Sequence, residues 1–206
     1  MTQFNEIIIT QYSEIPFEIF TMDNLFTPCE ITNFQKYIIE ETHKDKDNRK
    51  FTSSDFVNGK VINPTMSSMI YNKISHMLPS TYTDRKDQMW SFVESPKYIM
   101  YAKVEQDKQF AIHTDTGCEY DESNNKYSKF TTLTYLNDDY KGGNTIFYNS
   151  MFKETCRIIP RKGLTLCFDI ELFHAGDKVT HGTKYWVGTE LVCSRVVHLR
   201  NSSQSC

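Results

Sequence analysis

One short pattern in this 206-residue chain has the residue types and the spacing to bind a metal ion. His113-Thr114-Asp115 ends an alternating run that begins at Phe110, and on a strand side chains two residues apart project from the same face. His174, much farther along the chain, is the candidate third ligand. Two imidazoles and one carboxylate can occupy one face of a ferrous ion and leave the opposite positions open for reactants. The alternative is an ordinary hydrogen-bonded pair on a strand.

A second His-x-Asp pattern, at His43-Lys44-Asp45, lies in a charged segment at the end of a predicted helix. Side chains two apart on a helix diverge by about 200°, so we interpret this copy as a solvated helix end. We interpret the remaining histidines, His76, His181 and His198, as surface or packing residues, because none has an acidic partner on the same face.

Lys184 follows His174 by ten residues, at the predicted start of a strand. Its ammonium could bind one end of a dicarboxylate whose other end binds the metal, because a buried ammonium is costly unless it is paired. The alternative is a surface lysine at a turn. The neighbouring pair Gly142-Gly143 is typical of a hairpin turn.

Two helices are predicted in the N-terminal part of the chain. Thr27-Pro28-Cys29-Glu30 is a capping box with proline at the first helical position, and the apolar spacing after it predicts a helix to about residue 43. A second helix is predicted from Asn63-Pro64, ending before Pro79.

From about residue 91 the pattern changes to short segments rich in β-branched and aromatic residues, separated by Gly, Asn and Asp. Seven strands are predicted, at 98–102, 109–115, 130–137, 145–148, 155–160, 164–168 and 185–192. Helices followed by strands indicate an α+β, mainly β, fold. We expect one domain over residues 1–206, with a helical part at about 1–90, a β core at about 91–195 and a short C-terminal tail.

Composition narrows the function classes. The chain has 23 Lys+Arg and 26 Asp+Glu, a formal net charge of −3, which argues against a nucleic-acid partner. No apolar run approaches the ~20 residues of a membrane span, and residues 1–6 do not resemble a secretory signal. We therefore expect an intracellular, cytoplasmic protein with no membrane partner.

Five further segments carry a resemblance to a known family. After FAIHTD at 110–115 come TTLTYLN at 131–137, GGNTIF at 142–147, PRKGLTLCF at 160–168, HAGDKV at 174–179 and GTKY at 182–185. In this order the segments resemble the 2-oxoglutarate- and Fe(II)-dependent oxygenases, in their prolyl 4-hydroxylase-like branch, over roughly residues 17–193.

This resemblance implies a double-stranded β-helix, or jelly roll, braced by the N-terminal helices. It implies that His113, Asp115 and His174 hold Fe(II) as the catalytic centre, and that Lys184 binds the 5-carboxylate of the co-substrate 2-oxoglutarate. O₂ is the other reactant, succinate and CO₂ are released, and ascorbate is a further candidate cofactor.

The chain departs from the family pattern before His113. The glycine that often lies five or six residues earlier is replaced by Asp107 and Lys108, and the tyrosine usually found nine or ten residues earlier by Val104 and Lys103. A short shift could restore this role to Tyr101, and Thr131 is a second candidate contact to 2-oxoglutarate by its place in the TTLTYLN segment.

The resemblance favours hydroxylation of a C–H bond in a peptide, protein or amino-acid-like substrate, with peptidyl proline as the first candidate. Residues 116–128 and 51–62 are candidate substrate covers. Two alternatives remain open: oxidative demethylation of nucleic acid at the same site, and a catalytically silent binding domain of the same fold. Succinate production without a substrate distinguishes an enzyme from a silent domain.

Overall fold

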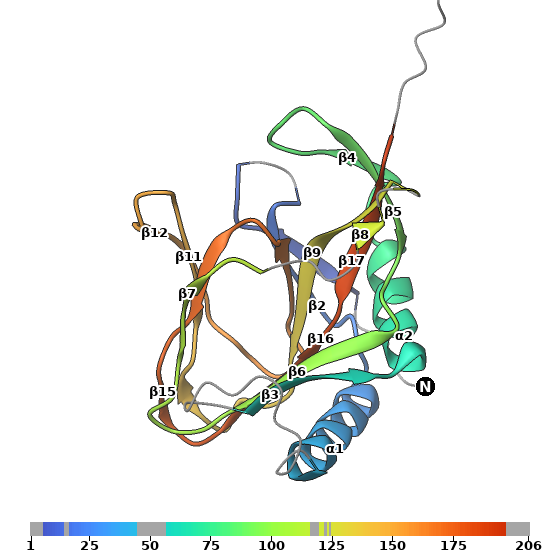
Figure 1. The fold of residues 1–206 in the computed structure, drawn as a ribbon. Helices are drawn as coiled ribbons and strands as arrows, with labels where there is room; N and C mark the ends of the chain where they lie inside the picture. Colours follow the sequence, from blue (N-terminus) through green and yellow to red (C-terminus); the bar gives the residue numbers. More distant parts are fainter. Residues whose placement is uncertain are drawn as a thin grey trace, which may run out of the picture.

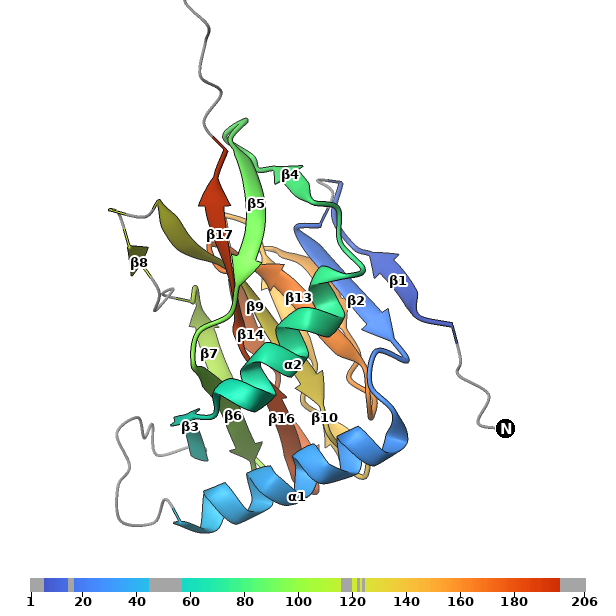
Figure 2. The ribbon, with the colours of Figure 1, turned by 90° about the vertical axis from the view of Figure 1, so that its right-hand side faces the viewer.

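The computed structural model describes residues 6–14, 17–44, 57–115, 120–121, 123 and 125–196. Two antiparallel β-sheets face each other, and two helices lie on the outer side of the larger sheet (Figures 1 and 2). This arrangement confirms the predicted α+β, mainly β, jelly roll braced by N-terminal helices. Neither helix has the length and apolar composition of a membrane span.

The larger sheet follows the order β1-β2-β13-β9-β16-β6-β3, and further strands join it through β9 and β17. Its strands are β1 (Ile8–Gln11), β2 (Ile19–Asp23), β3 (Val57–Ile62), β4 (Thr81–Thr83), β5 (Met89–Glu94), β6 (Tyr98–Val104), β8 (Tyr120–Asp121), β9 (Lys126–Tyr135), β13 (Thr165–Asp169), β16 (Lys184–Gly188) and β17 (Glu190–Arg195). Strands from the first third of the chain therefore complete a sheet whose centre comes from the last two thirds.

The smaller sheet has the order β12-β11-β14-β7. It contains β7 (Phe110–His113), β11 (Thr145–Tyr148), β12 (Glu154–Ile158) and β14 (Phe173–Gly176), while β10 (Lys141–Gly142) and β15 (Val179–His181) form a separate pair. Between the sheets lies an apolar layer that includes Leu133, Phe147 and Phe168. Both strands that carry the candidate histidines, β7 and β14, belong to this smaller sheet.

The helices begin where the sequence predicts. In α1 (Pro28–Lys44), the Thr27 backbone N–H donates to Glu30 Oε2 at 2.7 Å and the Glu30 backbone N–H donates to Thr27 Oγ1 at 3.2 Å, which completes the capping box. In α2 (Pro64–Ser75), Asn63 caps the first turn by accepting from the backbone N–H of Met66. Ile38, Ile70 and Ile74 are fully buried in the layer between the helices and the larger sheet.

Several predicted boundaries change in the structure. The run predicted at 185–192 is two strands, β16 and β17, because Thr189 bonds across to Thr132 instead of continuing either strand. In the candidate cover 116–128, residues 116–119, 122 and 124 lie outside the described residues, while 120–121 form β8 and 126–128 begin β9. In the candidate cover 51–62, residues 51–56 lie outside the described residues and 57–62 form β3.

Candidate metal centre

The two candidate histidines meet because their strands are neighbours in the smaller sheet. β7 pairs antiparallel with β14, and the register places His113 directly opposite His174, so both side chains project from the same face. Their ring centroids lie 4.2 Å apart. Residues separated by some sixty positions in sequence thus become cross-strand partners.

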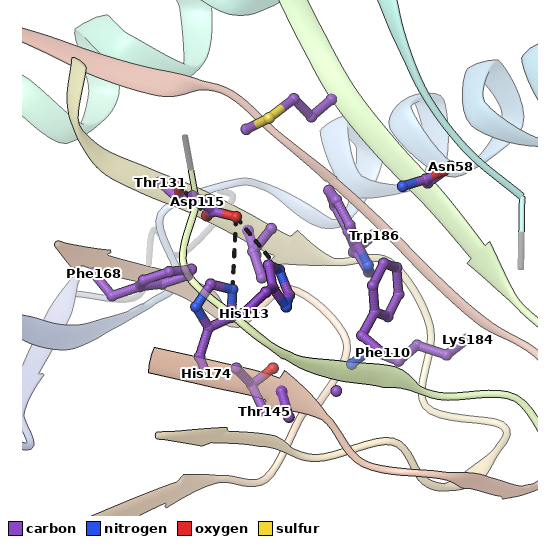
Figure 3. A pocket seen from close by; sticks show the side chains of 14 residues that line it. Asn58, Phe110, His113, Asp115, Thr131, Thr145, Phe168, His174, Lys184 and Trp186 are labelled. Carbon is purple, nitrogen blue, oxygen red and sulfur yellow. Dashed lines mark hydrogen bonds and ion pairs between the residues drawn. The ribbon is translucent and has the colours of Figure 1, made fainter. Parts of the chain in front are cut away.

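Asp115 lies just beyond the end of β7, where its backbone N–H donates to the carbonyl of Ile170 at 3.0 Å. Its Oδ1 lies 3.5 Å from His113 Nε2 and 3.7 Å from His174 Nε2. One ligand atom from each of the three residues lies within 4.8 Å of the other two. Figure 3 shows the three side chains pointing toward one another.

Backbone carbonyls fix how each imidazole presents its nitrogens. The distance from His113 Nδ1 to the carbonyl oxygen of Ala111 is 2.8 Å, and from His174 Nδ1 to that of Leu172 it is 3.0 Å. A carbonyl can only accept, so in each bond the Nδ1 carries the proton and donates it. Each Nε2 faces Asp115, and it is the nitrogen whose lone pair would bind a metal when the imidazole is neutral.

The charges of the three groups also suit a cation. Burial lowers the pKa of His174, so its imidazole is neutral at neutral pH. Hydrogen bonding to Asp115 raises the pKa of His113. Burial alone would raise the pKa of Asp115, but hydrogen bonds from His113 and Thr131 help to outweigh it, so this pKa lies below its ordinary value. An ionised carboxylate beside a neutral imidazole is the protonation state that binds a metal.

Thr131 lies on β9 of the facing sheet and contacts the second oxygen of Asp115. Its hydroxyl donates to Asp115 Oδ2 at 2.5 Å, which leaves Oδ1 to face the two histidines. The sequence pattern suggested that Thr131 contacts 2-oxoglutarate, whereas the observed contact orients a candidate metal ligand. The residue belongs to the pocket around the centre.

Lys184 occupies the opposite end of the same pocket. Only 5% of its surface is exposed, and its Nζ donates to the backbone carbonyl of Gly143 at 2.5 Å and lies 4.9 Å from the centre of the Tyr135 ring. Burial lowers the pKa of Lys184 to about 7. A neutral carbonyl and a ring only partly compensate a buried ammonium, so this end of the pocket favours an anion.

Gly143 has a role beyond the turn that its sequence indicated. Its φ of +69° is in the left-handed region, and a Cβ at this position would lie 3.1 Å from Cδ of Lys184. A side chain there would crowd the lysine that the Gly143 carbonyl holds in place. The glycine pair is therefore part of the anion end of the pocket.

Tyr101 requires a correction. On β6 the side chains alternate, and Met100 lines the pocket while Tyr101 lies in the core cluster that packs against the helices. A side chain on that face of the sheet does not reach the pocket. The expected contact between Tyr101 and 2-oxoglutarate is therefore not supported.

The structure adds residues that the sequence did not single out. The pocket lining also includes Asn58, Met100, Leu133, Thr145, Phe168 and Trp186. Thr145 accepts or donates a 2.8 Å hydrogen bond with Tyr135. Thr145 lay within a quoted motif, but Asn58 had no recognisable signal because its placement depends on how β3 pairs with β6.

A comparison with known families gives a match for the segment that contains this site. Residues 97–189, a little under half of the chain, match the family model described as the 2OG-Fe(II) oxygenase superfamily. This segment contains His113, Asp115, His174 and Lys184. Over this segment the chain is therefore similar to the 2-oxoglutarate- and Fe(II)-dependent oxygenases. The family implies Fe(II), 2-oxoglutarate and O₂ as cofactor and reactants. A comparison with curated proteins gives no significant match.

Solved structures with a similar fold include three prolyl hydroxylases. A prolyl hydroxylase from Trichoplax adhaerens, in complex with a hypoxia inducible factor peptide fragment, has a TM-score of 0.61 and 14% identity over 85% of this chain and 84% of its own. A Pseudomonas putida prolyl-4-hydroxylase has a TM-score of 0.58 and 10% identity over 85% and 92%. A viral collagen prolyl hydroxylase from Paramecium Bursaria Chlorella virus-1 has a TM-score of 0.56 and 18% identity over 90% and 96%. At these identities the likeness concerns the fold.

Proposed function

We propose that this chain, acting as a single domain, is an Fe(II)- and 2-oxoglutarate-dependent dioxygenase that hydroxylates a C–H bond of a peptidyl proline or another amino-acid-like residue and releases succinate and CO₂. His113, Asp115 and His174 would hold the iron, and Lys184 would bind the 5-carboxylate of 2-oxoglutarate. The observation that carries the proposal is one pocket with three converging ligand atoms at one end and a buried lysine at the other.

The residues present fit an iron ion and a keto acid. Two Nε2 lone pairs and one carboxylate oxygen form a three-ligand set with one negative charge, and such a set leaves coordination positions for reactants. The bound iron would supply the activation of O₂ that the protein's own side chains cannot supply.

The remaining side chains would hold the reactants. Lys184 would pair with the 5-carboxylate and so orient the keto acid along the pocket with its other end toward the metal ligands. Phe110, Trp186 and Met100 give this space an apolar wall, which limits the entry of water to the reacting atoms.

The similar solved structures support the substrate class. Three of them are prolyl hydroxylases, and one of these holds a peptide fragment. The test has two parts. Purified protein with Fe(II), 2-oxoglutarate and O₂ should form succinate without a peptide, and a proline-containing peptide library should give a product heavier by one oxygen atom. Protein that forms no succinate would contradict the proposed reaction, and would favour a silent binding domain.

Thr131→Val is expected to weaken metal binding without unfolding the protein. The change removes the hydroxyl that donates to Asp115 Oδ2 but keeps the shape of the side chain, so the carboxylate loses its fixed orientation. Loss of such an outer hydrogen bond typically costs about 10-fold to 100-fold in metal affinity. Titration with Fe(II) or Co(II) measures the effect, and Thr131→Ser should restore affinity. Equal affinity in the valine variant would exclude this orienting role.

The apparent affinity for 2-oxoglutarate is expected to fall as pH rises above 7. The pKa of Lys184 is about 7 in the free protein, so above this pH the lysine is largely neutral and must take up a proton before it can pair with a carboxylate. The KM for 2-oxoglutarate should then rise by up to about tenfold per pH unit between pH 7 and the higher pKa of the bound state.

Succinate production from pH 6 to 8.5 gives this KM, and calorimetry in buffers of different ionisation enthalpy detects the proton uptake. A KM that does not change between pH 7 and 8, with no proton uptake, would show that Lys184 is already charged in the free protein.

A further inference from the structure

The pocket contains one polar group that neither the metal site nor the lysine end uses. Asn58 lies on β3 and lines the pocket, and its Oδ1 is buried without a hydrogen-bond partner among the residues that the structure describes. A buried amide oxygen without a donor costs about as much as a lost hydrogen bond. Such a group in a binding pocket indicates a ligand that supplies the donor.

The sheet register explains why Asn58 faces the pocket. β3 pairs with β6 so that Asn58 lies opposite Ala102, and Ala102 lies opposite Trp186 on β16. These three residues form one row across the sheet, with the small side chain of Ala102 between the amide and the indole. Figure 3 shows Asn58 beyond Trp186 from the metal ligands.

The side-chain amide of Asn58 can be satisfied by a peptide substrate but not by 2-oxoglutarate. At neutral pH 2-oxoglutarate carries only hydrogen-bond acceptors, so it cannot satisfy the Oδ1 of Asn58. In an extended peptide the N–H and C=O of one residue point to the same side, and a side-chain amide offers both an acceptor and a donor in one plane. One residue of an extended peptide can therefore satisfy both atoms of the amide.

We propose that Asn58 binds the backbone N–H and C=O of one residue in the substrate, and so positions an extended peptide across the mouth of the pocket. In the order β1-β2-β13-β9-β16-β6-β3 of the larger sheet, β3 is the last strand. No other strand of this order therefore lies where a peptide beside β3 would bind. This inference rests on the proposed function, because it requires a peptide or protein substrate.

The test measures peptide binding separately from turnover. Short proline-containing peptides are bound to protein that holds Mn(II) and 2-oxoglutarate without O₂, and the best binder is then remade with a methyl group on each backbone nitrogen in turn. One methylated position should weaken binding to the native protein about tenfold. In Asn58→Leu, which keeps the side-chain volume, unmodified peptide should already bind about tenfold more weakly, and methylation at that position should have no further effect.

Ile62→Ala is the matched control, because Ile62 lies on the same strand, is 75% exposed and does not line the pocket. It should bind peptide as the native protein does, and it should keep the native KM for 2-oxoglutarate in succinate production. Equal peptide affinity in Asn58→Leu and native protein would overturn the role of Asn58. A native protein that forms succinate but binds no peptide would overturn both this inference and the substrate class.

Discussion

His174→Ala is expected to reduce succinate production by at least about 1,000-fold, with the fold intact. The imidazole is one of three converging ligands, and two remaining ligands would hold a divalent cation weakly. A bound metal contributes several kcal/mol of catalysis, and about 4 kcal/mol corresponds to 1,000-fold in rate. Asp115→Ala should have an effect at least as large, because it also removes the one negative charge of the set.

Metal titration and circular dichroism separate this loss from unfolding. His181→Ala is the matched control, because His181 is an exposed histidine on β15 and lies outside the three-residue set. The control should keep native activity and native metal affinity. If His174→Ala or Asp115→Ala still binds one Fe(II) with native affinity and turns over normally, the metal lies elsewhere.

Lys184→Met is expected to raise the KM for 2-oxoglutarate by about 100-fold or more, with little change in metal affinity. Methionine keeps the unbranched apolar stem and removes the ammonium, so the 5-carboxylate would be buried without its charged partner. Loss of one partner of a buried, hydrogen-bonded charge pair costs about 2–5 kcal/mol. The rate at saturating 2-oxoglutarate should fall less than the affinity does, since Lys184 lies away from the metal ligands (Figure 3).

Lys184→Met should not lower the free energy of unfolding. In the free protein the contacts of the buried ammonium with the described residues are a carbonyl and a ring, so its removal relieves a desolvation cost. Urea denaturation measures the free energy of unfolding. Lys162→Met is the control for this experiment and for the KM measurement, because Lys162 is an exposed lysine in a turn. A native KM for 2-oxoglutarate in Lys184→Met would assign the carboxylate contact to another residue.

Local patterns along the chain were sufficient to predict both helices and most core strands. The capping box at Thr27 and Glu30 and the cap at Asn63 involve residues within three positions of each other, so their geometry follows from short-range contacts. The exception is instructive: the run at 185–192 is continuous in composition, and only the bonds of Thr189 to Thr132 on another strand divide it.

The residue types and order of the candidate site were also readable from the chain, because a metal site and an anion site require particular donors. The residues that form the walls of the pocket could not be predicted from the sequence. The Thr131 contact with Asp115, the packing of Gly143 against Lys184 and the burial of Tyr101 on the other face all depend on which strands become neighbours and in which register.

A shift of one residue in a strand reverses the face of every side chain on it, and no local pattern specifies the register between β3 and β6. The placement of Asn58 opposite Ala102 is therefore a property of the folded sheets alone. The chain encodes which chemical groups are present, and long-range pairing of strands decides which of them share a pocket.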